Sequence, residues 1–92
     1  MSDLQPLISV IIPCFNQGKY LSGAAYSVIA QTYPHWECMI VNDGSTDNTH
    51  TIAESLALSD TRIRVIHQKN QGLSGARNTG LDNANGDFVQ FL

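Results

Sequence analysis

The segment Ile8-Ser-Val-Ile-Ile-Pro13 decides the fold class, because it is an apolar, β-branched run that a proline closes. A short run of this kind is typical of a strand that is buried on both faces of a parallel sheet. Residues 20–31 follow after a loop and predict an amphipathic helix. Their apolar side chains recur at helical spacing and are Leu21, Ala24, Ala25, Val28 and Ile29. The chain therefore opens with a strand and a helix, as α/β proteins do.

The alternation of strand and helix continues through the rest of the sequence. The further elements are expected, in order, as a strand at 36–42, a helix at 49–58, a strand at 62–67, a polar loop at 68–75, a helix that ends near 84 and a strand at 87–92. The inner face of the third helix is expected to consist of Leu73, Ala76, Gly80, Leu81 and Ala84. Because helices connect the strands, the strands must be parallel and the crossovers right-handed.

This βαβαβαβ order predicts a Rossmann-like α/β sheet with the strand order 3-2-1-4, in one domain that spans residues 1–92. In such sheets, ligands bind at the carboxyl ends of the strands, near the point where the strand order reverses. That point lies between the first and the fourth strand. We therefore expect residues 13–16 and 43–45 to line a ligand site.

The composition argues against several functional classes. The formal net charge is −3 and the basic residues are scattered, which disfavours a nucleic-acid partner. No apolar stretch approaches the roughly 20 residues that cross a bilayer, and the N-terminal segment lacks the basic residues of a signal peptide. We therefore expect a cytoplasmic protein.

The cysteines and histidines give no sign of a metal centre. Cys14 and Cys38 lie 24 positions apart, without the paired spacing of a zinc site, and are expected to be buried thiols. His35, His50 and His67 lie in three different segments and lack metal-ligand spacing. The sequence therefore predicts no metal ligand among these residues.

The turn after the first strand, residues 13–20, differs from the standard phosphate-binding turns. It has one glycine where the dinucleotide-binding fingerprint has three, and it lacks the Gly-Lys-Ser/Thr ending of a P-loop. The glycine-rich segment 72–80 has the wrong spacing and follows the third strand. Any nucleotide would therefore be bound without a glycine cradle.

Phe15 and Asp43 are the expected site residues with the chemistry to bind a nucleoside. An aromatic face stacks on a base, and a carboxylate accepts hydrogen bonds from a base imide or from ribose hydroxyls. Other interpretations stay open for both residues. Phe15 would instead close the core over the first helix, and Asp43 would instead stabilise its own turn or the start of the next helix.

Arg77 is the candidate for a contact with a diphosphate, because a guanidinium offers two donors to phosphate oxygens. It lies early in the third helix, just after the polar loop. Asn70, Gly72 and Ser74 would place polar groups and backbone amides beside the same ligand. The alternative for Arg77 is an ion pair with Asp43 or another acid.

Four sequence motifs follow one another along nearly the whole chain. They are Ser9-Val-Ile-Ile-Pro-Cys-Phe-Asn16, Ser27-Val-Ile-Ala-Gln-Thr32, Val41-Asn-Asp-Gly-Ser-Thr-Asp47 and Asn70-Gln-Gly-Leu-Ser-Gly-Ala-Arg-Asn-Thr-Gly80. Together they closely resemble family 2 glycosyltransferases, the inverting enzymes with a GT-A fold. Asn42 is a departure, since many members have a second aspartate there, but the acid after it is retained.

The resemblance implies that a nucleotide-diphosphate sugar is the donor. By family position, the nucleotide-sugar contacts are Pro13, Phe15, Asn16, Asp43, Gly72 and Arg77. Among these, Asp43 would bind the base, usually uracil, and Arg77 would bind the diphosphate. The implied acceptor is a glycan or a lipid-linked hydroxyl, so polysaccharide, glycolipid or cell-surface glycan synthesis is the expected role.

The resemblance also implies a divalent metal, Mn²⁺ or Mg²⁺. In the family, the strand that resembles residues 87–92 leads into an Asp-x-Asp motif that holds this metal, and the present sequence stops at Leu92, before such a motif. The acceptor half, with the catalytic base, is also expected beyond that point. We therefore name no catalytic residue and no metal ligand, and expect this chain to be an incomplete, inactive half of a GT-A domain.

Three further expectations concern the chain as a whole. The alternative to a transferase fragment is a non-catalytic nucleotide-binding or scaffold module. By the resemblance, the full-length protein would be cytoplasmic and peripheral at the inner membrane face. The fourth strand carries Phe88, Val89, Phe91 and Leu92 at a sheet edge, which predicts self-association through that edge.

Overall fold

The computed structural model describes residues 5–92, in which strands and helices alternate. In chain order the elements are β1 (Ile8–Cys14), α1 (Gly18–Ile29), β2 (Trp36–Asp43), α2 (Thr49–Ser59), β3 (Ile63–Gln68), α3 (Gly72–Asn83) and β4 (Phe88–Phe91). The strands are parallel and lie in the order β3-β2-β1-β4. The predicted α/β fold and its strand order are therefore confirmed. Within the described range, no helix has the length and apolar character needed to span a membrane.

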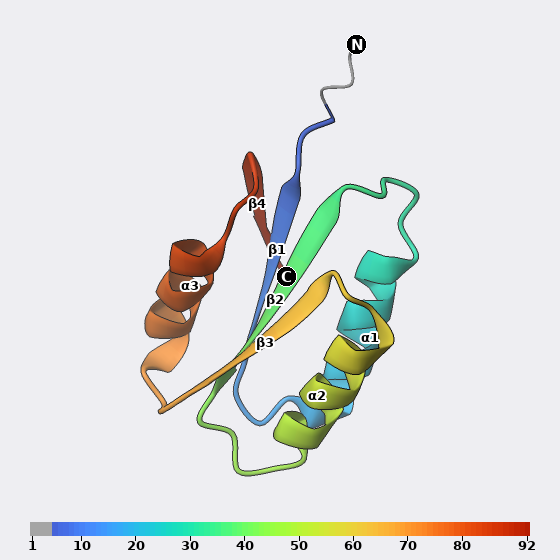
Figure 1. Cartoon of the computed structure of the whole chain (residues 1–92). Coiled ribbons are helices and arrows are strands. Elements are labelled where there is room, and N and C mark those ends of the chain that lie inside the picture. The colour runs from blue at the N-terminus through green and yellow to red at the C-terminus, as the bar shows by residue number, and fades with distance from the viewer. Residues whose placement is uncertain (1–4) are drawn as a thin grey trace.

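Helices α1 and α2 cover one face of the sheet, and α3 covers the other (Figure 1). The face under α1 and α2 holds the larger apolar core. Its buried members are Val10, Ile12, Cys14, Leu21, Ala25, Val28, Trp36, Cys38, Ile40, Ala53, Leu56 and Ile63. The members from β1 and from β2 are each two residues apart along their strand, as expected for strands whose side chains alternate between the two faces. The apolar side of α1 therefore packs against this face of the sheet.

The face under α3 holds a smaller apolar core, formed by Ile11, Met39, Val41 and Ala76. Gly80 lets α3 approach β1 closely, because a Cβ atom at this position would lie 2.4 Å from Ile11 Cγ2. That separation is far below normal van der Waals contact. The helix therefore lies against the sheet through small residues rather than through large apolar ones.

Helix α3 differs from the sequence prediction in its start and in its buried face. It begins at Gly72, so part of the expected polar loop is helical. Leu73 is 56% exposed and Leu81 is 44% exposed, so neither belongs to the inner face, whose fully buried residues are Ala76 and Gly80. The physical reason is the close approach of α3 to β1, which leaves no room between helix and sheet for a leucine.

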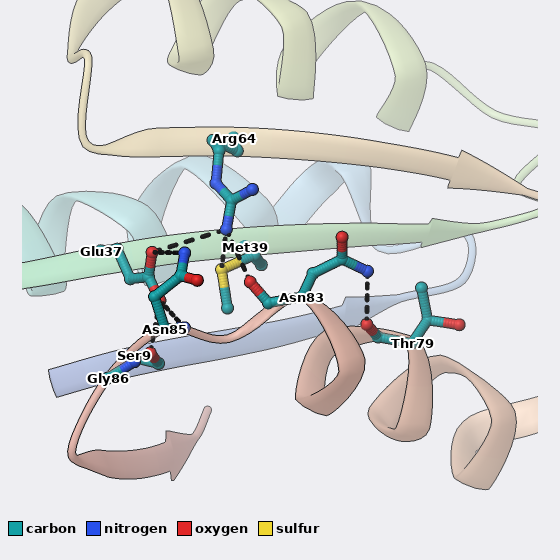
Figure 2. A network of polar contacts seen from close by, with 8 residues as sticks. All are labelled: Ser9, Glu37, Met39, Arg64, Thr79, Asn83, Asn85 and Gly86. Atoms are coloured by element: carbon teal, nitrogen blue, oxygen red, sulfur yellow. Dashed lines mark hydrogen bonds and ion pairs between the residues drawn. The ribbon is translucent and has the colours of Figure 1, made fainter.

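A polar network fills the α3 side of the sheet where the chain passes from α3 to β4 (Figure 2). The carboxylate of Glu37, on β2, accepts hydrogen bonds from Ser9 Oγ at 2.5 Å and from the Asn85 amide at 2.6 Å. The Arg64 guanidinium lies 3.5 Å from the same carboxylate. Desolvation raises the pKa of Glu37, but the hydrogen bonds and the Arg64 charge outweigh it, so the pKa is lowered overall. An ionised Glu37 therefore ties the connection before β4 to β1 and β2.

Cys14 and Cys38 are free, buried thiols, as predicted. Both belong to the core under α1 and α2. Burial raises the pKa of Cys14 to about 11 and that of Cys38 to about 12. Both side chains therefore stay protonated at neutral pH and pack as small apolar groups.

Strand β4 forms the edge of the sheet beside β1, with the pairs Ile8↔Phe88 through Ile11↔Phe91. Its side chains are exposed, Phe88 to 62% and Phe91 to 42%. An apolar edge of this kind offers unpaired backbone groups to another strand. Self-association through β4 stays a prediction.

Candidate functional site

A cleft of about 530 Å³ opens at the carboxyl ends of β1 and β2, with walls from α1 and α3. Leu92, directly after β4, also lines the cleft, so the cleft includes the point between β1 and β4 where the strand order reverses and where the sequence predicts a ligand site. The predicted site residues that line it are Pro13, Phe15, Asp43, Gly72 and Arg77. The remaining predicted contact, Asn16, lies outside the lining. The ends of β1 and β2, the loops that follow β1 and β3, and the helices α1 and α3 thus meet at one cleft.

Asp43, at the end of β2, is the only acidic side chain in the lining of the cleft over residues 5–92, and it is 2% exposed. One carboxylate oxygen, Oδ1, accepts hydrogen bonds from the Gln71 amide at 2.8 Å and from Gln68 Nε2 at 2.9 Å. In the part of the chain that the structure describes, no group donates a hydrogen bond to the other oxygen, Oδ2. The carboxylate is therefore held in place and keeps one acceptor oxygen for a ligand.

Gln68 positions Asp43, and sequence reasoning did not single it out. It ends β3 directly opposite Asp43 in the β2–β3 register. Its Oε1 accepts a hydrogen bond from Thr79 Oγ1 at 2.7 Å, which turns its Nε2 donor toward the carboxylate. The signal that would have found Gln68 is the pairing register, because a buried carboxylate needs donors and the paired residue on the next strand is within reach of it.

The chain closes over the end of β2 through Gly44 and Asn70. Asn70 Nδ2 donates to the Asp43 carbonyl at 3.1 Å. Gly44 has a φ of 75°, and a Cβ atom there would lie 2.7 Å from the Asn70 amide nitrogen. Only glycine meets both conditions without strain. The turn after Asp43 therefore allows the start of α3 to lie beside the carboxylate.

Phe15 is 48% exposed and lines the cleft. This placement excludes the interpretation in which Phe15 closes the core over α1. Tyr20 and Leu73 also line the cleft and add apolar surface to its walls. The cleft thus combines a buried carboxylate with an accessible aromatic side chain, which suits a flat ligand with a polar edge.

Arg77 and Gly72 bring α3 to the same cleft. The Arg77 guanidinium lies 5.4 Å from the centroid of the Phe91 ring, and within residues 5–92 it makes no ion pair. The alternative in which Arg77 pairs with Asp43 is therefore absent from the structure. Gly72 adopts a φ of 79° at the start of α3. The guanidinium keeps its donors available for an anionic ligand.

Asn16 joins two loops instead of lining the cleft. It has a φ of 52°, and its side-chain Oδ1 accepts hydrogen bonds from the amides of Thr46 at 2.7 Å and Asp47 at 3.3 Å. Its own amide donates to Ser45 Oγ at 2.9 Å. These contacts fix the β1–α1 loop against the β2–α2 loop. Asn16 therefore shapes the end of the sheet, and its predicted contact with a nucleoside stays a prediction.

The same β2–α2 loop caps two helices through Asp47. Its Oδ1 accepts from the Thr49 amide at 2.9 Å, at the start of α2, and its Oδ2 accepts from the Gly18 amide at 3.1 Å, at the start of α1. Thr49 is the largest cause of the lowered pKa of Asp47, through its side-chain hydrogen bond. Both helices that cover the larger core are thus anchored by one carboxylate at the cleft end of the sheet.

The cleft itself does not provide the ligands of a divalent cation. Mg²⁺ and Mn²⁺ prefer several oxygen ligands, and Asp43 is the single carboxylate that the described residues contribute here. One of its two oxygens already accepts two hydrogen bonds. The residues of the cleft therefore do not form the metal site that the family resemblance implies.

Comparison with known proteins identifies the family to which the chain belongs. The family model described as Glycosyl transferase family 2 matches residues 9–92. The chain is 42% identical to TuaG of Bacillus subtilis, named as a glycosyltransferase of teichuronic acid biosynthesis, over 100% of this chain and 37% of that protein. It is 47% identical to the glycosyltransferase GlyA of Streptococcus pneumoniae over 92% of this chain and 12% of that protein. The chain thus spans little more than a third, or less, of these relatives.

Solved structures share the fold. The mannosyltransferase PcManGT from Pyrobaculum calidifontis, in complex with GDP-Man and Mn²⁺, matches with a TM-score of 0.85 and 25% identity over 95% of this chain and 27% of that one. TarS 1-349 of S. aureus, in complex with UDP-GlcNAc, matches with a TM-score of 0.84 and 34% identity over 92% and 25% of the two chains. With the family match over residues 9–92, these likenesses show that the chain belongs to glycosyl transferase family 2.

Proposed function

We propose that the cleft binds the nucleotide of a nucleoside diphosphate sugar, with uridine as its nucleoside. The observation that carries this proposal is the buried Asp43 carboxylate, whose Oδ2 is left for a ligand inside the cleft. The imide N–H of uracil is a donor for that oxygen, and the Phe15 ring lies in the same cleft for stacking. The solved complexes of similar proteins with UDP-GlcNAc and GDP-Man support a nucleotide-sugar ligand.

The diphosphate would lie beside α3. Arg77 lines the cleft there, and its guanidinium matches phosphate oxygens with two parallel donors. The backbone of Gly72, at the start of the helix, lines the same wall. Backbone amides and the helix dipole favour an anion at such a place. Base and diphosphate would thus be recognised by different residues of one cleft.

The full-length protein would transfer the sugar to an acceptor hydroxyl with inversion. The hydroxyl oxygen would attack the anomeric carbon, the bond from that carbon to the diphosphate oxygen would break, and the hydroxyl proton would pass to a carboxylate base. Asp43 is not that base, because its Oδ1 accepts from Gln68 and Gln71 and its Oδ2 would accept from the uracil imide. The base, and any ligands of Mn²⁺ or Mg²⁺, would come from outside residues 5–92, and this chain alone would be inactive.

The proposed acceptor is a glycan or a lipid-linked sugar. The similarity to TuaG, whose name refers to teichuronic acid biosynthesis, supports a role in the synthesis of a cell-surface polysaccharide. Experiments on this chain test the binding of the sugar donor.

The direct test of donor binding is a calorimetric titration of the chain with UDP. Asp43→Asn keeps the shape of the side chain but removes the charge, and it is expected to weaken UDP binding at least about tenfold, because a hydrogen bond to a charged group contributes about 1.5–3 kcal/mol. Asp82→Asn, on the exposed side of α3, is the matched control and should bind UDP as the parent chain does. Unchanged affinity in Asp43→Asn would contradict the proposed contact.

Turnover in the full-length protein distinguishes a transferase from a non-catalytic binding module. With a UDP-sugar and an acceptor, the proposal expects release of UDP that depends on the acceptor, and loss of this release in Asp43→Asn. Tight UDP binding without any release, across a panel of sugars and acceptors, would favour the binding module.

A further inference from the structure

A cluster of two histidines and one glutamate lies on α2 and β3. His50 and Glu54 are one helical turn apart on α2, and His67 lies near the end of β3. Their potential ligand atoms all lie within 4.8 Å of one another. The His67 Nε2 atom is 2.7 Å from Glu54 Oε2, and the rings of His50 and His67 stack with their centroids 3.9 Å apart. The fold thus brings together residues that are far apart in sequence.

This cluster is separate from the cleft. None of its members lines the cleft among the described residues, and β3 is the edge strand on the far side of β2 from β1. The sequence predicted no metal site from the histidines because they lie in different segments. Spacing along the chain could not show that β3 places one histidine beside a pair on the neighbouring helix.

We propose that His50, Glu54 and His67 bind a transition-metal ion, with Zn²⁺ as the ion of the best matching ligand chemistry. Imidazole nitrogen and carboxylate oxygen are ordinary zinc ligands, at about 2.0–2.2 Å from the metal. Tetrahedral ligands at that distance lie about 3.4 Å apart. All three residues are exposed. The stacked rings of His50 and His67 would rotate about their side-chain bonds so that one nitrogen of each, together with a carboxylate oxygen of Glu54, faces the same ion.

The contact of the second ring nitrogen of His67 would have to change when a metal ion binds. Its Nδ1 lies 3.0 Å from Asn42 Nδ2, while Asn42 Oδ1 accepts from the Ser45 amide at 3.3 Å. A histidine that binds metal through Nε2 carries its proton on Nδ1 and needs an acceptor there. Asn42 meets that need only by turning its oxygen toward His67, which gives up the long contact with Ser45.

An aspartate at position 42 would satisfy both neighbours. One carboxylate oxygen would accept from the Ser45 amide and the other from His67 Nδ1–H. Carboxylate partners behind a ligating histidine raise metal affinity by about 10–100-fold. The geometry therefore predicts that Asn42→Asp tightens Zn²⁺ binding at least about tenfold, an effect that a general surface affinity for zinc would not produce.

The test is calorimetric titration of the purified chain with ZnCl₂. His50→Ala and His67→Ala are each expected to weaken Zn²⁺ binding more than about tenfold, and Glu54→Gln is expected to weaken it less. His35→Ala removes the third histidine, which is exposed and lies outside the cluster, and should leave the affinity unchanged. A rise in the melting temperature with added Zn²⁺ should disappear in the same cluster variants, because the ion joins α2 to β3.

Equal affinity in the parent chain, His50→Ala and His67→Ala, or an equal loss in His35→Ala, would overturn the proposal. Circular dichroism of each variant shows whether it is folded. If an alanine variant were unfolded, Asn42→Asp would still decide the question, since tighter binding supports the site and unchanged binding contradicts it.

Discussion

The two faces of the sheet are built in different ways. Under α1 and α2, the core is continuous and apolar, and it contains most of the buried large side chains. Under α3, a few apolar residues and Gly80 form the contact, and the polar network around Glu37 completes it. Hydrophobic burial therefore holds the first face, whereas close approach and hydrogen bonds hold the second.

The cleft has one wall from a helix on each face of the sheet. Its wall from α1 belongs to the helix that covers the larger core, and its wall from α3 belongs to the helix that is held by small residues. Asp43 lies between them at the end of β2. The helix that covers the smaller apolar core, α3, therefore supplies Arg77 and Gly72, the groups proposed to bind the diphosphate.

The largest effect on stability is expected from the core under α1 and α2. Leu56, on α2, is 4% exposed, and Leu58, two residues further along, is 88% exposed. Leu56→Ala should lower the free energy of unfolding by about 2–5 kcal/mol, because it removes buried methyl groups and leaves a cavity. Leu58→Ala should change it by no more than about 0.5 kcal/mol. Urea unfolding followed by circular dichroism measures both, and equal losses would contradict the described packing of α2.

A smaller loss of stability is expected from a substitution at the contact between α3 and β1. Gly80→Ala would place a Cβ atom 2.4 Å from Ile11 Cγ2, so the helix or the buried isoleucine must shift. We expect the free energy of unfolding to fall by about 1–2 kcal/mol. Overpacking costs about 1–3 kcal/mol, and the better helix propensity of alanine offsets part of that cost.

Gly23 provides the matched control for that substitution. It lies on α1, and a Cβ atom there would meet nothing within 4 Å. Gly23→Ala should therefore stabilise the protein by up to about 1 kcal/mol. If both glycine variants gained stability in the same urea unfolding experiment, this result would contradict the close approach of α3 to the sheet.

The polar network predicts a dependence of stability on pH. The pKa of Glu37 is lowered in the folded chain, so the unfolded chain takes up the proton first as the pH falls through the unfolded value of about 4.3. The contribution of Glu37 is therefore present above that pH and is lost as the pH falls toward the folded pKa. Glu37→Gln should flatten this part of the curve of unfolding free energy against pH. An unchanged slope would show that the network does not hold an ionised glutamate.

The sequence predicted the sheet well because its strands are apolar runs between helical connections. The β-branched run at Ile8–Pro13 has no other stable environment than a doubly covered strand, and the connections leave only a parallel arrangement. Asp43 and Phe15 could be placed at the cleft for the same reason, since both follow directly after strands that end at one edge.

Features that depend on tertiary contacts were beyond prediction. The start of α3 is polar and rich in glycine, so its local sequence predicts a loop, whereas packing of Ala76 against the sheet keeps it helical. The hydrogen bond from Gln68 to Asp43 depends on the strand register, and the approach of His50 to His67 depends on how α2 lies on β3. Each of these contacts joins segments whose spacing in sequence carries no signal.

Nuclear magnetic resonance mapping of UDP onto the ¹⁵N-labelled chain tests the proposed nucleotide site most directly. The amide signals expected to shift are those of residues that line the cleft, above all Phe15, Asp43, Gly72 and Arg77, together with the Gln71 amide that donates to Asp43. The groove between α1 and α2, at Tyr26 and Thr51, should give no shifts. Shifts confined to that groove, or no saturable shifts at the cleft, would contradict a nucleotide site at the carboxyl ends of β1 and β2.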